Sequence, residues 1–234
     1  MAAPGSTLPP HSTPKFLMKL LLLWLLPLLS YFPAVGPPAV GVTFSPLTKA
    51  AYLAAKKKAV STKPATTFPL KKVRGRIVIP TAKGSKIFQD IVVDEAALKR
   101  GISEAETIIH DYLGYLPAFN CHLLKINYYE TVQYLLISES GQQLELRGEP
   151  LFAPDMTHIV ATCMGIEYGG GQPNIIQLLA FLNGKLQQVW KREPKEWEPY
   201  RISWISSNSL LLSKEMWTGQ NPGNTFTYAK LEIH

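Results

Sequence analysis

Residues 174–191 read NIIQLLAFLNGKLQQVWK, two apolar runs joined by Asn183-Gly184. An Asn-Gly pair between apolar runs is the strongest short-range signal for a β-hairpin, because both residues tolerate the positive φ angles of a type I′ turn. A similar arrangement occurs earlier, where residues 131–138 and 143–147 lie on either side of a turn at Gly141. The central part of the chain is therefore expected to consist of antiparallel hairpins.

Short runs of strand-forming residues between polar turns continue this pattern on both sides. Further strands are expected at residues 76–80, 87–93, 105–115, 121–128, 158–164, 202–204, 209–213 and 225–233. The one clear helix signal lies near residues 94–101, where Asp94 can cap the first turn and Gly101 can end the last one. The pattern predicts an all-β fold, an antiparallel meander, with a β-sandwich as the alternative.

Three segments share one plan, in which an aromatic or proline-bearing lead and a polar turn precede a short apolar strand. They are residues 116–124, 151–160 and 202–211. The second contains Phe152-Ala153-Pro154-Asp155 followed by the strand His158-Ile159-Val160. It resembles the repeat of TolB-like and WD40-like propellers, and the surrounding chain resembles uncharacterised secreted bacterial proteins with such blades. This resemblance implies degenerate propeller-like blades in an incomplete or small propeller.

The N-terminal 41 residues have the three parts of a secretory signal. Lys15 and Lys19 precede the apolar run of residues 20–29, and small residues follow as far as Gly41. We predict a signal peptide over residues 1–41, with Met18 as an alternative start. The protein is then expected to be exported, to the periplasm or outside the cell, whereas an uncleaved leader would anchor it in the membrane.

Charge divides the chain in two. Residues 1–76 contain eleven of the 24 Lys and Arg residues, whereas all 17 Asp and Glu residues follow, beginning with Asp90. The composition of residues 42–72, rich in Ala, Lys, Thr and Pro, predicts a basic, disordered linker or arm before a β-rich domain at residues 73–234. The arm would either be a solvated linker or contact an anionic surface, and nucleic acid is not expected as its partner. The cations available for that contact are Lys56, Lys57, Lys58, Lys71, Lys72, Arg74 and Arg76.

The sequence contains none of the common catalytic motifs for metalloproteases, serine hydrolases, phosphate-binding loops or dithiol redox sites. No catalytic residue, metal site or cofactor is therefore predicted. Cys121 and Cys163 allow either one disulfide or two free thiols. The predicted ligand contacts are Glu167 and Tyr168, in a glycine-rich loop, and Trp197, which is flanked by glutamates.

These observations favour an exported, non-catalytic binding module whose ligand is a protein or a glycan. One alternative is a secreted hydrolase that uses carboxylates from different strands, drawn from Glu139, Glu145, Asp155 and Glu167. The other is an envelope-associated structural protein, held by an uncleaved leader and the basic arm.

Overall fold

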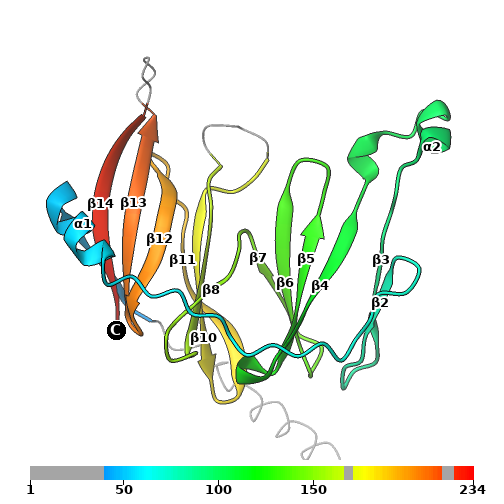
Figure 1. Cartoon of the computed structure of the whole chain (residues 1–234), viewed down its shortest axis with the longest axis horizontal. Helices are drawn as coiled ribbons and strands as arrows, with labels where there is room; N and C mark the ends of the chain where they lie inside the picture. Colours follow the sequence, from blue (N-terminus) through cyan, green and yellow to red (C-terminus); the bar gives the residue numbers. More distant parts are fainter. Residues whose placement is uncertain (1–39, 166–170, 218–223) are drawn as a thin grey trace, which may run out of the picture. The chain divides into compact units, whose positions relative to one another are not determined.

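A computed structural model describes residues 40–165, 171–217 and 224–234 of the chain (Figure 1). About half of the described residues lie in strands and about a tenth in helices, which confirms the predicted all-β class. Residues 1–39 of the predicted signal peptide lie outside the described residues, as do Glu167 and Tyr168.

The described strands form four separate antiparallel sheets, which does not match the two sheets of a sandwich. The β2–β3 sheet consists of β2 (Arg76–Ile79) and β3 (Lys86–Gln89). The β4–β7 sheet consists of β4 (Ile109–Leu116), β5 (Cys121–Asn127), β6 (Val132–Ser138) and β7 (Gln143–Leu146). The β8–β11 sheet consists of β8 (Leu151–Phe152), β9 (His158–Cys163), β10 (Ile175–Leu182) and β11 (Lys185–Arg192). The β12–β14 sheet consists of β12 (Glu198–Ser206), β13 (Ser209–Trp217) and β14 (Asn224–Ile233), and β1 (Val42–Leu47) adds to it beyond β14.

Neighbouring sheets are joined by shared apolar cores, so the larger sheets bury both faces. On β9, Ile159 packs toward the β4–β7 sheet while the next residue, Val160, packs toward the β12–β14 sheet. On β10, Leu179 and Leu178 divide in the same way. Successive strand residues point to opposite faces, so burial on both sides requires continuous apolar runs, as in the sequence of β10.

The local signals in the sequence mostly hold. Asn183 and Gly184 have φ angles of 52° and 73°, which confirms the predicted hairpin turn. The helix α2 (Glu95–Lys99) begins where expected, with the Asp94 carboxylate accepting a hydrogen bond from the Ala97 amide at 2.8 Å. The strand expected at residues 105–115 instead begins at Ile109, after the 3₁₀ turn η1 (Glu104–Glu106). A second 3₁₀ turn, η2 (Pro117–Phe119), links β4 and β5.

The prediction of a disordered arm at residues 42–72 is wrong. β1 pairs with β14 along its whole length, and the helix α1 (Lys49–Lys56) follows it with Thr48 as its cap. On α1, Tyr52 is buried and its ring stacks on Tyr228 of β14 at 4.4 Å between centroids. A few apolar side chains thus anchor this interval, although its average composition is that of a disordered segment.

Residues 59–68, here called the crossing segment, run in extended form past the first strand of each larger sheet (cyan in Figure 1). Single β-bridges join Val60 to Trp204 of β12, Thr62 to Phe152 of β8, and Thr67 to Tyr115 of β4. Each of these strands is at the edge of its sheet. The crossing segment therefore links three sheets that are far apart in the sequence.

Both cysteine thiols are free, Cys121 buried and Cys163 half-buried. Within the described part of the chain, no helix has the length and apolar character needed to cross a membrane.

Candidate functional site

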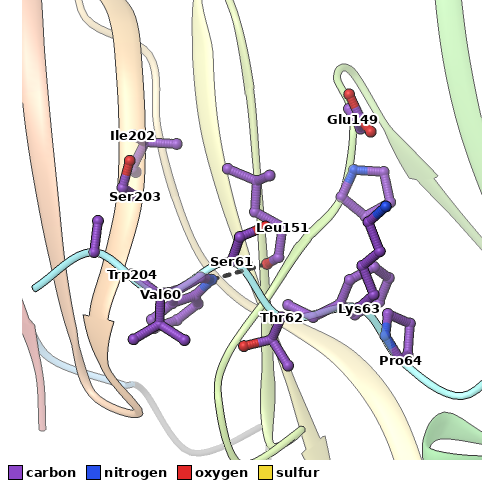
Figure 2. Close-up of a pocket in the computed structure, with 13 residues that line it drawn as sticks. Val60, Ser61, Thr62, Lys63, Pro64, Glu149, Leu151, Ile202, Ser203 and Trp204 are labelled. Carbon is purple, nitrogen blue, oxygen red and sulfur yellow. Dashed lines mark hydrogen bonds between the residues drawn. The ribbon is translucent and has the colours of Figure 1, made fainter.

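A pocket of about 300 Å³ lies where the crossing segment passes β12 and β8 (Figure 2). Its wall is built around Trp204, which is 2% exposed. The Trp204 indole N–H donates to the carbonyl oxygen of Leu151 at 3.0 Å, and its own carbonyl accepts from the Val60 amide at 2.8 Å. One tryptophan thus fixes the spacing between two sheets and the segment that crosses them.

The polar groups of this pocket are few. The buried hydroxyl of Thr62 has no hydrogen-bond partner among the described residues, and the charged side chains in the lining are Lys63 and Glu149. Most of the remaining lining is backbone and apolar side chain from the crossing segment, β8 and β12. We regard this pocket as a structural junction, because its walls are the contacts that join the sheets.

A second hollow, here called the Trp197 cleft, has a volume of about 820 Å³ and a different chemical character. It is formed by β1, the start of α1, the loop before β12, and β13 and β14. Its lining residues are Pro46, Leu47, Lys49, Glu196, Trp197, Lys214, Met216, Phe226, Thr227 and Tyr228. The cleft therefore depends on β1 and α1, which sequence reasoning assigned to a disordered arm.

Hydrogen bonds and aromatic rings position the cations at this cleft. The Asn174 amide donates to the carbonyls of Pro194 and Trp197 at 2.8 and 2.7 Å, which holds the loop that carries Trp197. The Arg192 guanidinium lies over the Phe44 ring at 4.5 Å and over the Trp197 ring at 5.5 Å. The Lys214 ammonium lies 5.3 Å from the Trp197 ring centroid. Trp197, which the sequence singled out, is thus in contact distance of two cations.

Positive charge at the Trp197 cleft is not neutralised within the described structure. Neither Arg192 nor Lys214 forms an ion pair with a described carboxylate. The cleft lining itself contains the cations Lys49 and Lys214 against the single acid Glu196, and Arg192 lies beside the lining at the Trp197 ring. Burial lowers the pKa of Lys214, and repulsion from Arg192 lowers it further. An anion bound here would relieve that repulsion, so the electrostatics favour a negatively charged ligand.

Of the carboxylates considered for hydrolysis, Glu167 lies outside the described residues and the other three each have a local partner. Glu139 accepts a 2.7 Å hydrogen bond from the Tyr115 hydroxyl, and this bond together with burial raises the Tyr115 pKa to about 12. Glu145 pairs with Arg147 at 3.2 Å, and Asp155 accepts from the hydroxyl of its neighbour Thr157 at 2.8 Å. Over the described ranges, no group of three or more His, Cys, Asp or Glu side chains could hold a metal ion.

The cations of the expected arm are divided among different surroundings. Lys72 belongs to an internal cluster, with its ammonium 2.5 Å from an Asp90 oxygen and 2.8 Å from the His110 carbonyl. Asp90 also accepts from the His110 amide at 2.8 Å. Lys56, Lys57 and Lys58 lie at the end of α1, whereas Lys71 and Arg74 precede β2 and Arg76 is its first residue. Sequence reasoning missed this cluster. The available signal was that Asp90 is the first acid in the chain, whereas its contact with His110 depends on how the strands pack.

No family model, curated protein or solved structure matches this chain.

Proposed function

We propose that the protein is an exported binding module, built from propeller-like blades, that holds an acidic glycan in the Trp197 cleft. The observation that carries the ligand assignment is the pair Arg192 and Lys214, which lie 5.5 and 5.3 Å from the centroid of the Trp197 ring without a described carboxylate partner. Cations without a partner at an open cleft attract carboxylate or sulfate groups, and Arg also offers paired donors for them.

The sheet topology supports the propeller-like part of the proposal. The β4–β7 and β8–β11 sheets are each four consecutive antiparallel strands, the content of a propeller blade. The β12–β14 sheet reaches four strands only because β1 adds to it. Pairing of β1 with β14 brings residues 42–47 and 224–233 into one sheet.

A glycan fits the apolar part of the cleft better than a small inorganic anion does. Phe226 is 40% exposed in the lining, and its ring lies 5.1 Å from that of Tyr200, on the strand that follows Trp197. Aromatic side chains that combine exposed ring surface with nearby polar groups suit ligands with both apolar and polar faces, as sugar rings have. Export, suggested by the N-terminal sequence, would place the module where acidic polysaccharides occur.

Binding of polygalacturonate, a carboxylated polysaccharide, tests this function. Wild-type protein should bind it more tightly than neutral dextran, and the difference should shrink at high salt. Lys214→Gln and Arg192→Gln should each weaken binding roughly ten- to hundredfold, since a charge-assisted hydrogen bond contributes about 1.5–3 kcal/mol.

Lys191→Gln is the matched control, because Lys191 lies next to Arg192 on β11 but is exposed and paired with Glu193 at 3.0 Å. It should bind polygalacturonate like the wild type. Equal losses in all three variants would indicate general charge attraction and would refute the assignment of the cleft. Sequencing the N-terminus of the protein recovered outside the cytoplasm tests export separately.

A further inference from the structure

The β2–β3 sheet has two strands, whereas each of the other sheets has four. One of its faces packs against the β4–β7 sheet. Ile77 and Ile79 of β2 are fully buried against Leu124, Leu135 and other residues of the β4–β7 sheet. The opposite face presents Val78 and Ile87, which are cross-strand partners and are 39% and 54% exposed. The sheet therefore has a buried inner face and an outer face on which one apolar pair, Val78 and Ile87, lies beside Arg76 and Gln89.

Backbone hydrogen bonds show which side of β2 is open. Arg76 uses both its amide and its carbonyl to bond Val73, at 3.0 and 2.9 Å, on the side away from β3. The Asp90 amide donates to the Gly75 carbonyl at 2.7 Å, so the residue before Arg76 points to the opposite side, toward the chain that follows β3. Groups two residues apart on a strand point the same way, so the amide and carbonyl of Val78 also point away from β3. Val73 already occupies this side at Arg76, so Val78 is the β2 residue that points there without a described backbone partner.

A groove of about 720 Å³ runs along this open side. It is lined by Pro69, Leu70, Lys71, Val73, Arg74, Arg76, Val78 and Gln89. Its charged residues, Lys71, Arg74 and Arg76, are all cations, and none forms an ion pair with a described carboxylate. The nearby Asp90 is already engaged by Lys72. The groove thus combines the unpaired amide and carbonyl of Val78, apolar side chains and uncompensated positive charge.

We infer that the open edge of β2 accepts an extended segment of a partner protein as a third strand, with acidic side chains that pair with Lys71, Arg74 and Arg76. Strand addition supplies main-chain hydrogen bonds for affinity, while the side chains give specificity. The charges argue against two other occupants. A second copy would bring the same cations against this edge, and residues 1–39 of this chain contain no acid.

The test uses the full chain and two fluorescent seven-residue peptides, one alternating valine with glutamate and the other alternating valine with lysine. The acidic peptide should bind at least tenfold more tightly by fluorescence anisotropy. It should also slow hydrogen exchange at the Val78 amide in NMR spectra. Peptide binding without protection of that amide would overturn the inference, as would equal affinity for the two peptides.

Charge reversal gives a result that misfolding cannot mimic. The double variant Arg74→Glu/Arg76→Glu should prefer the lysine peptide to the glutamate peptide. The control Lys57→Glu/Lys58→Glu makes the same change in net charge at the end of α1 and should keep the wild-type preference. A dimer in light scattering with Val78 already protected would identify a second copy as the occupant and refute the assignment of an acidic partner.

Discussion

A substitution at Gly114 tests whether the crossing segment stabilises the fold. It lies at a bulge in β4 with a φ of +116°, directly under residues 66 and 67 of the crossing segment. A Cβ atom at this position would lie 2.8 Å from the Thr67 carbonyl oxygen and against the Thr66 methyl group. Gly114→Ala should therefore push the crossing segment away from β4 and weaken its bridge to Tyr115.

The loss in the free energy of unfolding has two parts, backbone strain and overpacking, and a second glycine with the same kind of backbone separates them. Gly184 also has a positive φ, +73°, but a Cβ there would meet open space. Gly184→Ala should cost about 1–2 kcal/mol, the penalty of a left-handed conformation. Gly114→Ala carries about 1–3 kcal/mol of backbone strain and about 1–3 kcal/mol of overpacking. The excess of roughly 2 kcal/mol corresponds to a further fall in Tm of about 4–8 °C for a body of this size.

Differential scanning calorimetry measures the two Tm values, and thermolysin cleavage mapped by mass spectrometry locates the change. Cleavage within residues 59–68 should accelerate in Gly114→Ala and stay at the wild-type rate in Gly184→Ala. If the two variants lose the same Tm and show the same cleavage pattern, the crossing segment contributes no stability through this contact. The reasoning about its role would then be refuted.

Three further changes test other parts of the structure. Burial raises the Asp90 pKa, but hydrogen bonds from Lys72 and His110 outweigh it and lower the folded pKa. The stability that Asp90 provides is thus present above its unfolded pKa of about 3.9 and is lost as pH falls through the lower folded value. Asp90→Asn should therefore be less stable than the wild type near neutral pH, and the difference in their free energies of unfolding should shrink below about pH 4 in acid denaturation. Burial raises the Cys121 pKa to about 12, so a disulfide reagent at pH 8 should modify this thiol only upon unfolding, which mass spectrometry can follow. Trp204→Phe leaves the β8 carbonyl without its donor and should lower the free energy of unfolding in urea by about 1–3 kcal/mol, whereas an unchanged midpoint would show that the bond is dispensable.

Local features of the sequence predicted most of the strands, because each depends on neighbours in the chain. Asn183-Gly184 needs only its own φ angles to form a turn, and Asp94 caps a helix three residues away. The apolar runs of β9 and β10 are typical of strands buried on both faces, but they do not show that adjacent residues enter different cores. The assignment of such runs to two cores depends on which sheets become neighbours, and no local pattern contains that information.

The parts that could not be predicted depend on contacts between distant residues. β1 is a strand because β14, nearly two hundred residues later, provides its partner. The crossing segment has single bridges to three sheets and no periodicity of its own. For the Trp197 cleft, the sequence singled out the tryptophan but not Arg192 or Lys214, since their proximity follows from the same long-range pairing.

This dependence on β1 changes how the basic residues should be tested. A deletion of residues 42–76 would remove the cations, but it would also remove β1, α1, the crossing segment and the first residue of β2. Loss of binding by such a truncation would therefore report an incomplete fold. Point changes at Lys57, Arg76 and Lys214 keep every strand in place, and these residues lie at α1, the β2 edge and the Trp197 cleft respectively. Comparing these variants distinguishes the three cationic surfaces. In the sequence, two of them belong to one basic segment and the third is represented by Lys214 alone.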